Sequence, residues 1–315
     1  MPIRENGKEL LILISLFLKS RAKEKLKGVY LKTVLGMLVC YIPEYILSQT
    51  IIVATVSLSR AQSIGAVIIP SLIAIIVSIF VTDIFGVGFF RSLVELNDCQ
   101  GEKTYNINLV LSGFGRNYTN ILKSTFLRRL YMFGWFGLMM LPMILAVGII
   151  AFLSASPAVS GLISLIGQAM QSPTPTMAEN IVNYIAENCI YVTYILGGAS
   201  VLSGVLFIPA IRKSYEYQTI PMILAEHPDL KPCDAFKATK EIMCGYRMKY
   251  FLVELSFIGI LILIQIAVAL VPNTIITYIL MALAVPYMQM TFLQFYFWRT
   301  RREEADVIEL VINNE

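Results

Sequence analysis

Two long apolar runs in the C-terminal part of the chain constrain its fold more than any other feature. They cover residues 251–271 and 275–298, and only Pro272-Asn273-Thr274 separates them. A helix crosses the roughly 30 Å hydrocarbon core of a bilayer with about 20 residues, and each run is long enough to do so. A three-residue connection cannot hold a domain in water between the two runs. The pattern therefore predicts a transmembrane helical hairpin.

The composition extends this prediction to the whole chain. Of the 315 residues, 57% are hydrophobic and 15% are charged, whereas a soluble domain is about 45–50% apolar and about 25% charged. We expect an all-α fold, a polytopic transmembrane helix bundle with cytosolic and interfacial amphipathic helices. A basic amphipathic helix over residues 1–28 precedes the membrane domain 29–298, and a cytosolic tail over 299–315 follows it. The predicted spans are about 29–47, 64–88, 130–152, 189–211, 251–271 and 275–298.

The distribution of positive charge predicts the orientation of this bundle. Of the 25 lysines and arginines, 24 fall at the N-terminus up to Lys32, in residues 91–129, in residues 212–249, or in the tail. Only Arg60 falls on the opposite side of the six predicted spans. Positive residues are enriched in cytoplasmic loops. We therefore expect a multi-pass protein of a bacterial inner (cytoplasmic) membrane with both termini in the cytoplasm.

Four further segments carry apolar patterns outside the clear spans. Residues 7–27 combine an apolar core with basic turns, which fits an interfacial helix on an anionic surface or simply the positive flank of the first span. Residues 51–58 either continue the first span or lie at the outer surface. Residues 157–170 contain a short helix that fits a place in or on the membrane. Residues 109–130 predict an amphipathic helix that leads into the third span.

The polar segment before the C-terminal hairpin predicts a cytosolic helix with both ends marked. Pro232 suits the first turn of a helix, and Asp234 is favourable near its N-terminus. Gly245 suits the left-handed position that follows a helix C-terminus. The apolar face of this helix either turns the chain between two spans or forms a gate or a docking surface.

Ionisable and amide side chains within the spans are the candidate functional residues, because burying charge in hydrocarbon is costly. Glu44 is the strongest of them, although Pro43 beside it can place it near the outer surface. The glutamines could line an interior or form hydrogen bonds between helices. The full candidate set is Glu44, Asp83, Glu254, Gln265, Gln289 and Gln294.

Two of these carboxylates have basic neighbours in the sequence. Glu254 is close enough to Arg247 or Lys249 for a structural ion pair. Asp83 can reach Arg91 through the membrane interface. Both arrangements would satisfy a charge without giving it a functional role.

Several classes of chemistry have no support in the sequence. The five cysteines show no C-x-x-C spacing, and His227 is the only histidine, so we expect neither a metal site nor a disulfide framework. Phosphate-binding glycine motifs and protease signatures are also missing. No basic stripe is interleaved with exposed aromatics, which argues against nucleic acid as a partner. We therefore expect a non-enzymatic protein without catalytic residues, cofactor or metal.

The C-terminal third carries a series of short motifs that resembles one known family. They include Tyr215-Glu216-Tyr217, the run from Ile223 to Pro228, Ala235-Phe236-Lys237, the run from Phe251 to Gly259, and Val285-Pro286-Tyr287. The pattern, together with the N-terminal segment Arg21 to Gly28, is similar to the DUF975 family of uncharacterised bacterial integral membrane proteins. The motif positions that we single out are Tyr215, Tyr217, Pro228, Met243, Gly245, Ser256, Phe257, Gly259, Pro286 and Tyr287.

Two positions depart from the family pattern. Ile260 stands where the family usually has tryptophan, and Thr239 where it usually has serine. The resemblance implies a polytopic membrane protein with no established activity, so it supplies no mechanism.

Two functions remain open on these grounds. The protein could bind or move an amphipathic molecule, such as a lipid or a peptide, in which case a polar cavity should reach Glu44. Alternatively, it could be a membrane scaffold or accessory subunit that docks a membrane or cytosolic protein partner through residues 97–129 and 212–249. The lipid bilayer is the expected partner in either case.

Overall fold

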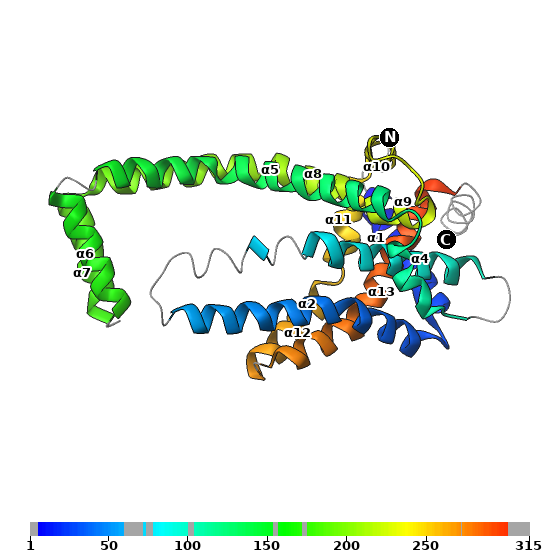
Figure 1. Ribbon diagram of the computed structural model, residues 1–315. Helices are drawn as coiled ribbons and strands as arrows, with labels where there is room; N and C mark the ends of the chain where they lie inside the picture. Colours follow the sequence, from blue (N-terminus) through cyan, green and yellow to red (C-terminus); the bar gives the residue numbers. More distant parts are fainter. Residues whose placement is uncertain are drawn as a thin grey trace. The chain divides into compact units, whose positions relative to one another are not determined.

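The computed structural model describes residues 6–59, 72–73, 78–99, 104–153, 157–171, 175–271 and 273–301 (Figure 1). These residues contain helices and no β-strand, which confirms the all-α class. The chain divides into two compact units, Met1–Arg129 with Tyr215–Glu315 (unit 1) and Leu130–Ser214 (unit 2). The helices are α1 (Asn6–Leu26), α2 (Tyr30–Ser59), the π-helix η1 (Ser78–Thr82), α4 (Asp83–Asp98), the 3-10 helix η2 (Ile107–Phe114), α5 (Tyr118–Phe152), α6 (Pro157–Gln171), α7 (Pro175–Asn188), α8 (Ile190–Tyr217), α9 (Ile220–Glu226), α10 (Pro232–Met243), α11 (Arg247–Leu255), α12 (Ile258–Leu270) and α13 (Thr274–Thr300).

Among the described residues, four helical stretches are long and apolar enough to cross a membrane. The bent pair α11 and α12 makes a fifth if it counts as one crossing. These stretches expose large apolar side chains such as Phe152 and Leu270, which are 86% and 77% accessible, the reverse of a water-soluble surface. The four stretches are Tyr30–Ile52, Tyr118–Phe152, Ile190–Glu226 and Thr274–Thr300. Residues 64–71 and 74–77 of the predicted span 64–88 lie outside the described residues, so the count of six spans stays a prediction.

The described helices extend or divide several of the predicted spans. The span at 29–47 continues through 51–58 as one helix that ends at Ser59, so that run extends the first helix. The helix expected over 109–130 is wrong in its first part, which is the 3-10 helix η2 followed by a turn at Gly115. Close packing explains this difference, because a Cβ on Gly113 would overlap Ile84 of α4.

The predicted span 251–271 is not one continuous helix. The α11 helix ends at Leu255, α12 begins at Ile258, and the two are bent by 45°. The Lys19 ammonium donates a hydrogen bond to the Ser256 carbonyl oxygen at 3.0 Å, and the Ser256 hydroxyl donates to the Val253 carbonyl oxygen at 2.5 Å. These bonds satisfy carbonyl groups that a helix end leaves without partners.

The core of unit 1 surrounds α4. This helix packs closely on η2, so closely that a Cβ on Gly88 would overlap the Val110 carbonyl oxygen. It also contacts α9, and α13 contacts both α1 and α2. An aromatic cluster joins α11 to α13, with the Tyr250 ring stacked 4.9 Å from Phe292 and edge-on to Phe295 at 5.2 Å.

The two ends of α10 lie where the sequence predicted them. It begins at Pro232, has Asp234 in its first turn, and is followed by Gly245 with φ of +77°. Its apolar face is covered within unit 1, because Thr239 and Met243 are fully buried. The Thr239 hydroxyl donates to the Glu216 carbonyl oxygen at 2.5 Å and also bonds the Thr219 hydroxyl. The apolar face of α10, which the sequence offered as a docking surface, is therefore covered by other residues of unit 1.

Unit 2 is a pair of long helices closed by a short helical hairpin. The helices α5 and α8 meet where the Ser200 hydroxyl lies 3.7 Å from the Met143 sulfur. The hairpin α6–α7 turns away from their ends (Figure 1). A small core of Val159, Leu162, Cys189 and Val192 joins the hairpin to the beginning of α8.

Candidate functional site

The candidate site is a groove between α2 and α13 that contains Glu44. Its volume is about 540 Å³, and it opens to the outside of the helices. One wall comes from α2, and the other comes from the turn between α12 and α13 and the first turns of α13. The lining residues are Tyr41, Glu44, Val268, Asn273, Thr274, Thr277, Tyr278 and Met281.

A second, apolar hollow of about 260 Å³ shares a wall with this groove. The shared wall is formed by Tyr41 and Tyr278, whose ring centroids lie 5.4 Å apart. Tyr45 approaches Tyr278 edge-on at 5.8 Å. The remaining lining is aliphatic, from Leu38, Ile42, Ile275 and Ile279. A groove that contains polar side chains and an almost wholly apolar hollow therefore meet at a pair of tyrosine rings.

Local sequence rules explain how this site is built. Tyr41, Glu44 and Tyr45 are three and four residues apart on α2, so they share one helix face. Asn273 begins α13, where its side-chain oxygen accepts hydrogen bonds from the N–H groups of Ile275 at 2.9 Å and Ile276 at 3.4 Å. Glu44 lines the groove together with Asn273 and Thr274, so it lies beside the turn between α12 and α13.

Asp83 is bound by two arginines in the first half of α5. The Arg129 guanidinium holds both carboxylate oxygens, with Nη2–Oδ1 at 2.7 Å and Nε–Oδ2 at 2.8 Å. Arg128 approaches Oδ1 at 3.4 Å. The expected partner Arg91 is therefore wrong. The charge of Arg129 also acts on Glu44, but its guanidinium is already engaged by Asp83.

The partner of Glu254 also differs from the predicted one. Arg247 forms its ion pair with the buried Glu216, at 2.5 Å, and not with Glu254. Glu254 instead interacts with the Tyr215 hydroxyl. One oxygen of Glu254 and the Nε atom of Arg247 are buried without a hydrogen-bond partner among the described atoms.

The three candidate glutamines do not line the groove. Gln265 is exposed on α12, and Gln289 is half-buried on α13. Gln294 is fully buried, where its amide donates to the Asn97 side-chain oxygen at 2.8 Å. The structure thus brings none of the glutamines to Glu44.

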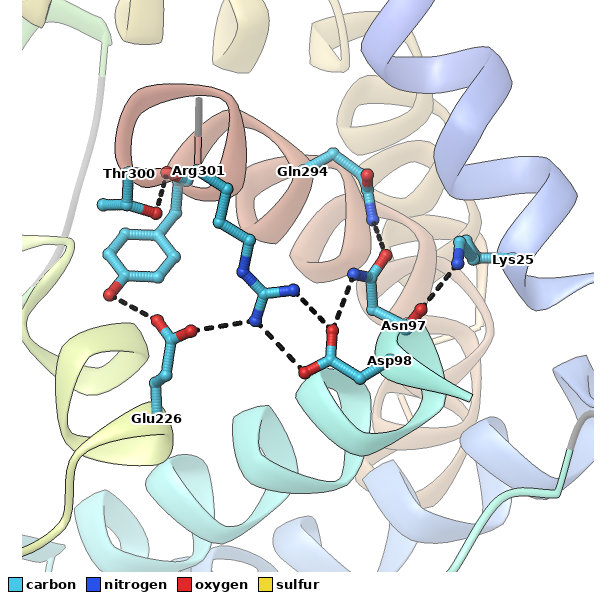
Figure 2. A network of polar contacts seen from close by, with 8 residues as sticks. Lys25, Asn97, Asp98, Glu226, Gln294, Thr300 and Arg301 are labelled. Carbon is cyan, nitrogen blue, oxygen red and sulfur yellow. Dashed lines mark hydrogen bonds and ion pairs between the residues drawn. The ribbon is translucent and has the colours of Figure 1, made fainter. Parts of the chain in front are cut away.

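Gln294 belongs to a polar network at the end of α13 that is centred on Arg301 (Figure 2). Arg301 binds the Asp98 carboxylate through two nitrogens, at 2.5 and 3.1 Å, and the Glu226 carboxylate at 2.8 Å. The Tyr296 hydroxyl donates to the other Glu226 oxygen at 2.8 Å. The network connects the ends of α4, α9 and α13.

The same network extends to α1. The Lys25 ammonium donates to the Asn97 carbonyl oxygen at 2.6 Å (Figure 2). Burial opposes ionisation of Asp98, but hydrogen bonds from Arg301 and Asn97 and the charges of Arg301 and Lys25 outweigh it and lower the pKa of Asp98. Burial likewise disfavours the charged form of Arg301, yet its bonds to the two carboxylates raise its pKa. The network therefore holds its charges in place and fixes four helix ends to one another.

The family-motif residues lie in packing positions. Ser256, Phe257 and Tyr287 meet at the break between α11 and α12, where the Phe257 and Tyr287 rings lie 5.5 Å apart. The Lys19 ammonium sits 4.3 Å from the Phe257 ring centroid, and burial lowers the pKa of Lys19. The other motif residues also lie in unit 1. Two tyrosines pack on aromatic rings, Tyr215 on Tyr250 and Phe251, and Tyr217 on Phe236. Met243 and Pro286 are buried, Gly245 follows α10, Pro228 lies in the turn after α9, and Gly259 lies in α12.

Sequence reasoning missed the aromatic half of the groove. Tyr41 and Tyr45 carried a usable signal, because they lie on the same helix face as Glu44. Tyr278 carried no such signal, since only the packing of α13 on α2 brings it there. Sequence reasoning also missed Lys19, whose ammonium group donates a hydrogen bond to the Ser256 carbonyl oxygen at the break between α11 and α12.

These features define a multi-pass helical membrane protein with a groove beside Glu44. Residues 15–302 match the family described as Protein of unknown function (DUF975), and the chain belongs to that family. The motifs in the sequence predicted this membership. The chain matches no curated protein and no solved structure.

Proposed function

We propose that this protein binds an amphipathic molecule with an ammonium group, such as an aminolipid, in the groove at Glu44. The observation that carries the proposal is the place of Glu44, which lies in a groove of about 540 Å³ beside an apolar hollow. Ligand sites commonly have volumes of about 300–1,000 Å³. The protein acts on this molecule without catalysing a reaction.

The lining chemistry supports a cationic head group. A carboxylate attracts an ammonium ion directly, and tyrosine faces attract it through their ring quadrupoles. Tyr41 and Tyr278 are half-buried beside Glu44, and Thr274 and Thr277 add hydroxyl groups. The adjoining hollow is lined by aliphatic side chains and tyrosine rings, which suits the alkyl chain of the same molecule.

The orientation of the protein follows from the basic segments. The network around Arg301 draws together the ends of α1, α4, α9 and α13 in unit 1. The groove lies at the opposite end of α13, near Thr274. Under the positive-inside rule, the network end and both termini are cytoplasmic. The groove then opens towards the outer leaflet of a bacterial inner membrane.

Spin-labelled lipids test this proposal directly. In vesicles containing the full chain, we expect a larger motionally restricted fraction of labelled phosphatidylethanolamine than of labelled phosphatidylglycerol. Glu44→Gln keeps the shape of the side chain and removes its charge, so it should abolish the preference. Glu179→Gln, an exposed carboxylate on α7, is the matched control and should retain it. Equal restriction of the two lipids by the unaltered protein would reject the function.

A further inference from the structure

The α6–α7 hairpin of unit 2 carries an apolar edge that its own core does not cover. On α6, the buried residues Val159 and Leu162 face the hairpin core, whereas Ile163 and Ile166 are 51% and 42% exposed. On α7, Val182 is 64% exposed. Branched aliphatic side chains of this size are costly to leave in water.

Each helix of the hairpin separates polar from apolar residues. On α6, the exposed polar residues Ser160, Ser164 and Gln168 recur every four residues and form one stripe. On α7, exposed polar side chains include Asn180 and Asn183. This two-sided pattern is typical of helices that lie in a membrane interface.

The direction of the hairpin agrees with such a position. Figure 1 shows α6 and α7 running crosswise to the long helices α5 and α8 of the same unit. The long helices are candidate membrane spans, so they follow the membrane normal apart from tilt. A hairpin crosswise to them lies along the membrane plane.

Aromatic residues mark the membrane boundary at the same level. Phe152 ends α5 and is 86% exposed. Tyr191 and Tyr194 lie in the first two turns of α8, with Tyr194 71% exposed. Exposed tyrosines at span ends are typical of the interface between hydrocarbon and water. The hairpin connects these two helix ends, so its core lies at that boundary.

The charge of the hairpin indicates the kind of surface that it contacts. Between Pro157 and Asn188 the sequence has two acidic residues, Glu179 and Glu187, and no lysine or arginine. An anionic lipid surface would repel this segment, and no basic group is available to attract it. The contact must rest on apolar burial.

We propose that the α6–α7 hairpin is an interfacial anchor that lies in the plane of the membrane surface. Ile163, Ile166 and Val182 are embedded at the boundary between head groups and acyl chains, and the polar stripe faces water. The anchor does not depend on anionic lipid. It fixes the depth of the α5 and α8 ends in the leaflet. This inference is independent of the ligand proposed for the groove at Glu44.

Site-specific fluorescence in vesicles tests the anchor. The background chain has Cys99, Cys233 and Cys244 replaced by serine, and it retains the buried Cys40 and Cys189. A bimane label is then placed at Ile163→Cys or Val182→Cys on the apolar edge. The matched controls on the polar side are Ser164→Cys and Asn183→Cys. Labelling of the background chain alone measures any contribution of the buried thiols.

The expected result is a contrast between the two sides of the hairpin. Lipids brominated in the upper acyl chain should quench the labels at 163 and 182 at least about twofold more than the labels at 164 and 183. Aqueous iodide should quench in the opposite order. Replacing phosphatidylcholine by a mixture with phosphatidylglycerol should leave the contrast unchanged.

Two results would overturn the anchor. Equal iodide quenching at all four positions would place the whole hairpin in water. Protection of positions 163 and 182 from both iodide and brominated lipid would show that protein covers the apolar edge, either a second copy of the chain or another partner. Gel filtration of each labelled variant shows whether the protein is folded, and Val182→Cys supplies a second position if Ile163→Cys aggregates.

Discussion

The two units of this chain differ in how much of their apolar surface they bury. Unit 1 has a protein interior, with fully buried Leu93, Phe257 and Phe295 and with polar networks inside it. The long helices of unit 2 are mostly exposed, because the most apolar parts of α5 and α8 are only 11% and 6% buried. In unit 1, α2 is as exposed at 11%, but α13 is 28% buried. Similar apolar sequence thus gives a self-packed bundle in one region and a pair of helices with exposed apolar faces in the other.

This difference teaches that hydropathy alone does not tell which helices carry the structural specificity. In a bilayer, helices gain little from hiding apolar surface from lipid, so packing and polar contacts decide their association. Unit 1 has both kinds of contact at α4, which packs on η2 and ends in the Arg301 network. Substitutions should therefore act strongly in unit 1 and weakly on the faces of unit 2.

The largest expected effect comes from the contact between α4 and η2. Gly88→Ala places a Cβ against the Val110 carbonyl oxygen, so the two helices must separate. We expect a loss of stability of about 3 kcal/mol, measured as the thermal unfolding temperature in detergent.

Gly86→Ala is the matched control for that substitution. It lies on the same helix, and a Cβ there meets no atom within 4 Å. It should be neutral or should stabilise the protein by up to about 1 kcal/mol, because alanine favours helix more than glycine. Equal effects of the two substitutions would contradict the close packing of unit 1.

A smaller effect is expected from the polar network. Asp98→Asn removes the charge that Arg301 binds and should lower stability at neutral pH by about 1 kcal/mol, since the carboxylate is partly exposed. The pKa of Asp98 is lowered in the folded state. Its contribution is therefore fully present above the unfolded value of about 4 and is lost as the pH falls through the lower folded pKa.

The pH dependence separates this charge effect from a packing effect. The stability difference between the native chain and Asp98→Asn should shrink as the pH falls below about 4. It should be smallest below the lowered pKa of folded Asp98, where both side chains are neutral. A difference that stays constant from neutral to acid pH would show that Asp98 acts through shape rather than charge. Unfolding temperatures of both proteins across this pH range provide the measurement.

The parts of the fold that follow local rules could be predicted from the sequence. The apolar runs identified the helices because a membrane span needs only length and apolar composition. The ends of α10 were also predictable, since Pro232 and Gly245 act through their own backbone conformations. Family membership followed from motifs that lie mainly in unit 1.

The side-chain partners could not be predicted in this way. Asp83 is held by Arg129, 46 residues away, and not by the nearby Arg91. Arg247 pairs with Glu216 because the packing of α11 on its neighbours brings them together, although Glu254 is closer in sequence. Glu44 was identified as a candidate, but its groove needs Tyr278 from α13. Such contacts depend on tertiary packing, which a single sequence does not specify locally.

The smallest effect is expected on the exposed apolar face of unit 2. It tests the same comparison between the two units, here by a substitution in unit 2. Val201 on α8 is 70% exposed, so Val201→Ser removes no protein contact of importance. We expect the unfolding temperature in detergent to change by no more than the equivalent of about 0.5 kcal/mol.

Val192→Ser, on the same helix, is the matched control. It places a hydroxyl in the hairpin core, where Val192 is 4% exposed, and should lower stability by about 2 kcal/mol. If Val201→Ser destabilised the protein as much as Val192→Ser, that face of α8 would be a protein interface rather than a lipid-facing surface. The contrast between a self-packed unit 1 and a unit 2 with exposed apolar faces would then be wrong.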